Sequence, residues 1–116
     1  MTTIDITLPI RTVSEANMRE HWGAKAARAR QQRETVKLGL YNLRALRPPH
    51  ECHVVVKLTR HAHKVMDGDN LQRSLKAVRD EVAAFIGLDD GSRWLEWDYA
   101  QTKGEYAVNI RIEWGG

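Results

Sequence analysis

The feature that most constrains the fold of this chain is an apolar stripe at helical spacing, set between two acidic turns. Six apolar residues recur every three or four positions: Leu71, Leu75, Val78, Val82, Phe85 and Ile86. This spacing is typical of a helix with one buried face. Asp69 fits the N-cap of the helix, with Gln72 as its capping-box partner, and Gly87 fits its C-terminal end. The stripe must pack on another apolar surface, which the rest of the chain has to supply.

Strand patterns supply that surface. Alternating or β-branched residues predict four strands, over Thr2–Leu8, Cys52–Arg60, Arg93–Gln101 and Tyr106–Trp114. The connections include a helix over about Trp22–Leu46, frayed or kinked near Gly39, a polar loop over His61–Met66 and a hairpin turn at Thr102–Gly104. The order β-α-β-α-β-β predicts a single α+β domain over residues 1–116, with a small mixed sheet and two main helices packed on it.

The length and composition of the chain exclude several classes of protein. A chain of 116 residues is one domain, and it contains no run of about 18 apolar residues that would span a membrane. Residues 1–10 alternate and lack the apolar core of a signal peptide. The single Cys52 excludes an internal disulfide and fits a reducing, cytoplasmic setting.

Charge is unevenly distributed around a net value of +3. Residues 11–50 hold nine Lys/Arg against three acids, whereas residues 65–100 hold eight Asp/Glu against four Lys/Arg. A DNA-binding surface beside a metal site would produce this division, and so would a solvated helix face beside an acidic surface. The candidate phosphate contacts on the basic helix are Lys25, Arg28, Arg30, Arg33 and Lys37.

The acids gather at two points, Asp67-Gly-Asp69-Asn70 and Asp89-Asp90. Like charges repel, and a divalent cation is one reason to gather them. Phosphodiester hydrolysis uses Mg²⁺ or Mn²⁺ held by hard carboxylate oxygens, with a nearby cation for the leaving oxygen. Lys76 and Arg73 lie on successive turns of the predicted helix and can supply that cation. Each piece also has an ordinary explanation: turns, a helix cap, and a Lys76–Asp80 surface pair.

The distance between the two acidic segments is an obstacle to a single metal site. A straight helix of 18 residues is about 27 Å long, at 1.5 Å per residue. Asp69 and Asp90 therefore share a metal only if the helix stops short and the chain doubles back, or if sites combine across a dimer.

Taken together, Asp67-x-Asp69-Asn70-Leu71, Lys76-x-x-x-Asp80 and Leu88-Asp89-Asp90 resemble the signature of the RusA-like Holliday junction resolvases, small dimeric endodeoxyribonucleases common in prophages. The resemblance extends to Leu8-Pro9, Ser14, Asn17 and His21 after the first strand. The chain departs from the family pattern at the catalytic lysine, where it has Arg73, and Lys76 follows one turn later.

The resemblance implies a RusA-like fold and a Mg²⁺-dependent nuclease that resolves four-way DNA junctions as a homodimer. Asp67, Asp69 and Asp90 would bind the metal, and Lys76 or Arg73 would be the catalytic cation. We add Asn70 to the expected DNA contacts.

Other interpretations remain. Cys52, His53, His61 and His63 invite a zinc site, but Cys52 and His53 are adjacent on a strand and point to opposite faces. His21 and Trp22 fit DNA contacts or packing, and the strand tryptophans Trp94, Trp97 and Trp114 fit a core or an interface. The rival functions are a non-catalytic DNA-binding protein with the same fold and an acidic interaction module without nucleic acid.

Overall fold

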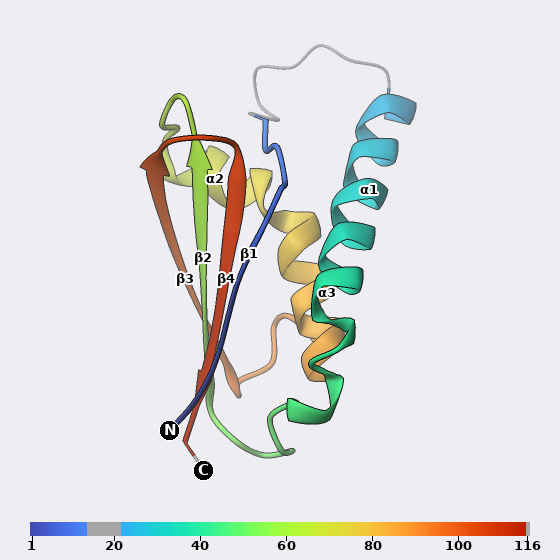
Figure 1. Cartoon of the computed structure of the whole chain (residues 1–116), viewed down its shortest axis with the longest axis vertical. Helices are drawn as coiled ribbons and strands as arrows, with labels where there is room; N and C mark the ends of the chain where they lie inside the picture. The colour runs from blue at the N-terminus through green and yellow to red at the C-terminus, as the bar shows by residue number, and fades with distance from the viewer. Residues whose placement is uncertain (14–21, 116) are drawn as a thin grey trace.

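Four strands form one mixed sheet in the computed structural model, which describes residues 1–13 and 22–115 (Figure 1). The strands are β1 (Thr2–Leu8), β2 (Val54–Ala62), β3 (Leu95–Lys103) and β4 (Ala107–Trp114). Their order in the sheet is β1-β4-β2-β3. β4 is antiparallel to both of its neighbours, whereas β2 and β3 are parallel. The predicted α+β class with a small mixed sheet is therefore confirmed.

The last two strands follow each other in sequence but are not neighbours in the sheet. β2 lies between them and forms ladders with β3 on one side and β4 on the other. The connection passes over the end of β2, where the Gly104 amide donates to the Ala62 carbonyl over 3.0 Å (Figure 1). The predicted hairpin at Thr102–Gly104 is therefore wrong. Consecutive strands are often but not always adjacent, and here β2 and β4 are the two interior strands.

β2 is also longer at its C-terminal end than its sequence pattern predicts. The strand continues through His61 and Ala62, which the sequence assigns to a polar loop. Ala62 is fully buried, so it continues the inward-facing series of Val54, Val56 and Leu58. A small residue at an inward position does not interrupt a strand, although it weakens the apolar pattern by which a strand is recognised.

α1 (Trp22–Tyr41) is the long basic helix, and a 3-10 turn, η2 (Arg44–Leu46), follows it. The α-helix continues through Gly39 and ends two residues later, at Tyr41, rather than at Leu46. Gly39 packs on β1: a Cβ at this position would lie 2.6 Å from Leu8 Cδ2. Val36 and Leu40 of α1 are buried, whereas Leu46, in the tighter 3-10 turn, is exposed.

The second predicted helix is divided in two, α2 (Gly68–Ser74) and α3 (Lys76–Ile86). The Ser74 hydroxyl donates to the Leu71 carbonyl over 2.8 Å, and this carbonyl is the normal acceptor for the Leu75 amide. The Leu75 amide bonds instead to the carbonyls of Gln72 and Arg73. Leu75 thus leaves the helical conformation, with φ −104° and ψ 5°. The six-residue stripe is buried as predicted, but on two helices rather than one.

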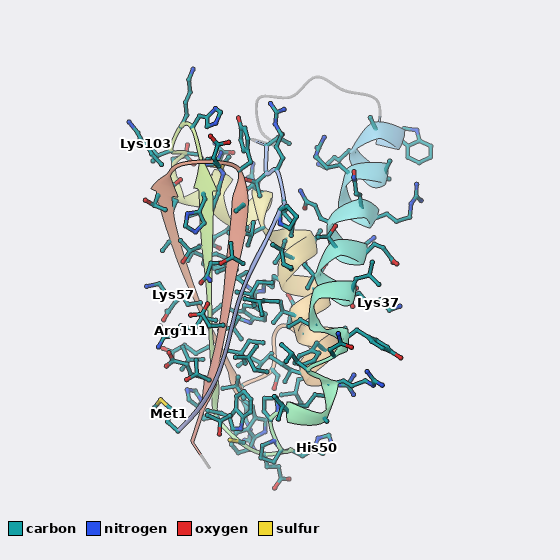
Figure 2. All side chains as sticks on the ribbon, in the orientation of Figure 1. Met1, Lys37, His50, Lys57, Lys103 and Arg111 are labelled. Carbon is teal, nitrogen blue, oxygen red and sulfur yellow. The ribbon has the colours of Figure 1, made fainter. Side chains whose placement is uncertain are left out.

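The core lies between the sheet and the helices. Its largest fully buried side chains come from every layer: Val36 and Leu40 of α1, Leu75, Val78 and Val82 of the α2–α3 region, and Leu58, Ile110 and Ile112 of the sheet. The other face of the sheet carries polar side chains, among them Lys57 and Arg111, on the side away from α1 (Figure 2). Among the described residues, no helix has the length and apolarity needed to cross a bilayer.

The division at Leu75 generates a prediction. Leu75 is 0% exposed at the point where α2 meets α3, so Leu75→Ala should lower the free energy of unfolding by about 2–5 kcal/mol. Leu38→Ala, at an exposed position of α1, should change it by less than about 0.5 kcal/mol. Urea denaturation followed by circular dichroism measures both. Equal effects would contradict the assignment of Leu75 to the core.

Candidate functional site

Three side chains on one face of β3 hold the two acidic segments in place. Trp97, Tyr99 and Gln101 alternate along the strand, so they share a face at intervals of about 6.6 Å. Trp97 and Tyr99 pack against the core that the helices cover. Trp97 bonds to Asp90, Tyr99 bonds to Arg79 of α3, and Gln101 bonds to the residue immediately before Asp67.

Gln101 positions the first segment through both ends of its amide. Its Nε2 donates to the Met66 carbonyl over 2.6 Å, and its Oε1 accepts from the Met66 amide over 3.0 Å. This pair of bonds fixes the backbone immediately before Asp67. The inward position of Gln101 on an alternating strand is the sequence signal for this role, because a polar residue there needs a partner.

Asp67, not Asp69, is the N-cap of α2. Its Oδ1 accepts from the Asn70 amide over 2.9 Å, and its Oδ2 accepts from Asn70 Nδ2 over 3.1 Å. The predicted capping box of Asp69 and Gln72 is therefore wrong, because the helix begins at Gly68, two residues before the start that an N-cap at Asp69 would give. Asp69 lies in the first turn with an exposed side chain. That carboxylate has no hydrogen bond or ion pair within the described part of the chain.

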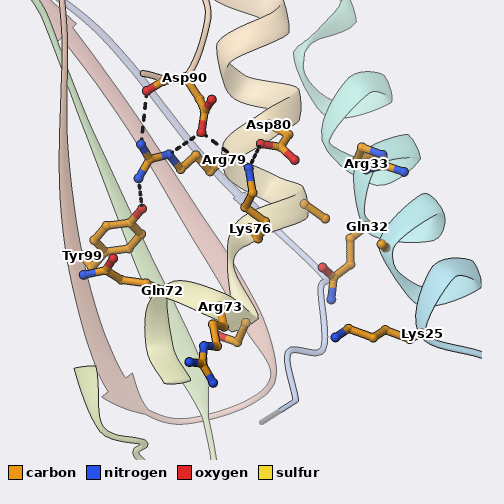
Figure 3. A pocket seen from close by; sticks show the side chains of 13 residues that line it. Lys25, Gln32, Arg33, Gln72, Arg73, Lys76, Arg79, Asp80, Asp90 and Tyr99 are labelled. Carbon is orange, nitrogen blue, oxygen red and sulfur yellow. Dashed lines mark hydrogen bonds and ion pairs between the residues drawn. The ribbon is translucent and has the colours of Figure 1, made fainter. Parts of the chain in front are cut away.

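Asp90, in the second segment, is held by α3 and by β3. Its Oδ2 lies 3.1 Å from Arg79 Nε and 3.5 Å from Lys76 Nζ (Figure 3). Its backbone carbonyl accepts from Trp97 Nε1 over 2.8 Å and from Arg79 Nη2 over 3.2 Å. Partial burial alone would raise the pKa of the Asp90 carboxyl, but its hydrogen bond with Asp89 and the charges of Lys76 and Arg79 outweigh this and lower it.

Arg79 links these groups and was not identified from the sequence. Its Nη1 donates to the Tyr99 hydroxyl over 2.6 Å, and its guanidinium carbon lies 4.7 Å from the centre of the Trp97 ring. The sequence signal for Arg79 is its spacing of three residues from Lys76, because positions i and i+3 lie on one helix face.

The chain doubles back after α3, as one of the two geometric alternatives requires. Gly87 ends α3 in a left-handed conformation, with φ 89°, and the following loop returns along the helix to place Asp90 beside Lys76, the first residue of α3. The loop thus brings Asp90 to the start of α3, beside Lys76 rather than beside Asp69.

The three predicted metal ligands nevertheless fall into two groups. Asp90 lies with Lys76 and Arg79, whereas Asp67 and Asp69 lie at the start of α2. Within residues 1–13 and 22–115, no three His, Cys, Asp or Glu side chains are close enough together to hold a metal ion. The donor chemistry suits Mg²⁺, because all three are carboxylates and the Asp69 oxygens are exposed. Asp90 would have to exchange its bonds to Lys76 and Arg79 for a metal.

A cavity of about 550 Å³ opens between α1 and the α2–α3 region (Figure 3). Its charged lining is mainly basic: Lys25, Arg33, Arg73, Lys76 and Arg79, against Asp80 and Asp90. Lys76 also bonds to Asp80 over 2.6 Å, and this bond is the main reason that the pKa of Lys76 is raised. Arg73 forms no ion pair among the described residues. Both candidates for the catalytic cation thus line one cavity, and only Lys76 is paired with carboxylates.

The predicted DNA contacts are dispersed. Lys25 and Arg33 line this cavity, and Asn70 lines a second cavity with Asp67. Arg28 lines a small cavity between α1 and the residues after β1, whereas Arg30 and Lys37 are on exposed parts of α1. Trp22 is exposed and Trp114 is buried in the core. Ser14, Asn17 and His21 lie outside the described residues.

Comparison with known proteins adds no identification: no family model matches the chain, and no curated protein matches its sequence.

The bonds of Arg79 generate a stability prediction. Arg79→Met removes three hydrogen bonds and leaves the Asp90 carboxylate without its nearest cation, so it should lower the free energy of unfolding by about 1–3 kcal/mol. Arg30→Met, on the exposed side of α1, serves as the control and should have little effect. Thermal unfolding by calorimetry measures both, and an unaffected Arg79→Met protein would mean that the network does not stabilise the fold.

The lowered pKa of Asp90 generates a pH prediction. A carboxyl whose folded pKa lies below its unfolded value of 3.8 stabilises the fold above that value, and it loses the contribution as the pH falls through the folded pKa. Asp90→Asn lacks this contribution. The difference in unfolding free energy between wild type and Asp90→Asn, measured in EDTA, should therefore be constant from pH 7 to about 5 and shrink below about 3.8. A difference that grows on acidification would contradict the assignment.

Proposed function

We propose that this protein is a Mg²⁺-dependent endodeoxyribonuclease of the RusA-like type, which cuts four-way DNA junctions as a homodimer. The observation that carries the proposal is the common anchoring of the two acidic segments. Gln101 fixes the residue before Asp67, and Trp97 and Arg79 fix Asp90, so neighbouring positions of one strand face organise both. The basic cavity between α1 and α3 lies beside them and suits a phosphate backbone.

Asp67, Asp69 and Asp90 would hold the metal. When bound, Mg²⁺ neutralises phosphate charge and lowers the pKa of the attacking water. Asp69 suits this role because its side chain is exposed and forms no hydrogen bond or ion pair with described residues. Asp67 keeps its carboxylate at the start of α2 through the two bonds from Asn70.

Arg73 is the better candidate for the cation that stabilises the leaving oxygen. It lines the cavity, and no described carboxylate lies within ion-pair distance of it. Lys76 already bonds to Asp80 and lies 3.5 Å from Asp90. A cation neutralised by two carboxylates offers less positive potential to a phosphate. Lys76 would instead balance the charge of Asp90 until a substrate or metal enters.

A second candidate is a non-catalytic DNA-binding protein with the same fold. The ion pairs of Asp90 with Lys76 and Arg79 favour it, because a carboxylate already neutralised by two cations has less need of a metal. The DNA surface would then be the basic cavity and α1 alone.

The decisive experiment compares wild type with Asp69→Asn on a labelled four-way junction and a linear duplex of the same sequence. With Mg²⁺ or Mn²⁺, wild type should place paired nicks in the junction, and EDTA should abolish them. Asp69→Asn should reduce cleavage by about 100-fold or more and leave junction binding unchanged. Asp98→Asn, an exposed position on β3, is the matched control and should cleave normally. Junction binding by wild type without cleavage under either metal would favour the binding protein.

A further inference from the structure

A second cavity, of about 600 Å³, lies at the other side of α2, beyond the C-terminal end of β2. The residues after β1, the loop before α2 and the start of β4 surround it. Its charged and aromatic lining consists of Arg11, Arg60, His63, Lys64, Asp67 and Tyr106. Asp67 belongs to this lining and also to the proposed metal site, so the two sites adjoin.

Arg60 is the unusual member of this set. It follows Leu58 on the inward face of β2 and is only 5% exposed, although it carries a charge. Its Nε donates to Thr12 Oγ1 over 2.7 Å, and its Nη1 donates to the Lys64 carbonyl over 2.7 Å and to Gln101 Oε1 over 3.5 Å. All three acceptors are neutral. In the described part of the chain, no carboxylate lies within ion-pair distance of Arg60, and its Nη2 donates to no protein acceptor.

A buried cation without a counter-charge is costly. Burial lowers the pKa of the Arg60 guanidinium from its ordinary value, but arginine stays charged in proteins. The neutral acceptors orient the guanidinium, and no carboxylate of residues 1–13 and 22–115 compensates its charge. Buried arginines are usually paired, and an anion that enters the cavity would supply such a partner.

The other charges around the cavity favour an anion as well. The Arg11 guanidinium carbon lies 4.7 Å from the centre of the Tyr106 ring, and the His63 ring lies 4.6 Å from the same ring. Arg11 and Lys64 are exposed at the edge of the cavity. Asp67 is the one carboxylate in the described lining, and both of its oxygens already accept hydrogen bonds from Asn70.

We propose that this cavity is a phosphate subsite, in which the buried Arg60 guanidinium binds a backbone phosphate of the nucleic acid adjacent to the one that is cut. The nucleic-acid source of the phosphate rests on the proposed function, whereas the phosphate chemistry does not. A planar guanidinium can offer two parallel N–H groups to two phosphate oxygens. α2 presents Asp67 and Asn70 to this cavity and Gln72 and Arg73 to the first, so a backbone crossing α2 would meet both.

The first test measures DNA binding in EDTA, so that cleavage plays no part. Arg60→Gln should weaken binding of a labelled four-way junction by about tenfold and reduce the salt dependence by about one unit of slope. Lys57→Gln, three residues earlier on the same strand but on its polar face, is the control and should bind as wild type does. Equal affinity and equal slope for Arg60→Gln and wild type would overturn the proposal.

Arg60 is buried, so a surface variant decides wherever Arg60→Gln does not fold. Arg11→Gln changes an exposed residue of the same cavity and should weaken DNA binding by about threefold. Circular dichroism verifies the fold of each variant. Unchanged binding by Arg11→Gln, where Arg60→Gln is unfolded, would overturn the proposal.

The second test separates nucleic acid from free phosphate as the occupant. Inorganic phosphate at constant ionic strength should raise the unfolding temperature of wild type but not of Arg60→Lys, which keeps the charge and loses the paired donors. If wild type binds no DNA but shows this stabilisation, the proposed function fails and the phosphate subsite stands. If phosphate stabilises wild type but Arg60→Gln binds DNA as tightly as wild type does, the proposal that nucleic acid occupies this cavity is wrong. No phosphate effect together with unaffected DNA affinity would overturn the subsite itself.

Discussion

The guanidinium of Arg79 is the point on which the arrangement of this molecule depends. It donates to the Asp90 side chain, to the Asp90 carbonyl and to the Tyr99 hydroxyl, and it lies over the Trp97 ring. One side chain thereby joins α3, β3 and the loop between them. Because a guanidinium presents its donors in a rigid plane, these partners cannot shift independently. The loop after α3 consequently returns toward the start of that helix, and Asp90 comes to lie beside Lys76.

The face of β3 that carries Trp97, Tyr99 and Gln101 explains why the two acidic segments lie so close to the core. Trp97 and Tyr99 contribute apolar rings to the core and polar tips to the loops, as amphipathic aromatic residues commonly do. Gln101 continues the series with an amide that satisfies both polar groups of the Met66 backbone. Buried polar groups are costly only when they are unpaired. Arg60, near the end of β2, is the exception: its hydrogen bonds are to neutral acceptors, and no carboxylate among the described residues compensates its charge.

Much of the fold was predictable from the sequence because buried residues recur at the regular spacing of a strand or a helix. The stripe from Leu71 to Ile86 predicted its buried residues correctly, and the alternation in Thr2–Leu8 predicted a strand of which Ile4 is buried and Ile6 and Leu8 are partly buried. The candidate site was less predictable. The acids and the candidate cations were identified, but Arg79, Gln101 and Arg60 were missed because each is a polar residue within an otherwise apolar pattern. Such a residue needs a partner, and the sequence does not show which distant group supplies it.

The sequence by itself determined the apolar periodicities that predict four strands and two helical regions, and the segregation of acidic and basic residues along the chain. These properties depend on local spacing and composition, which can be read directly from the sequence. Only the tertiary structure decided that β2 lies between β3 and β4 and that Asp90 returns to Lys76. Each of these depends on competition between partners for a sheet edge or a charge. The outcome depends on which groups lie close together in three dimensions, and the spacing of residues along the chain does not show this.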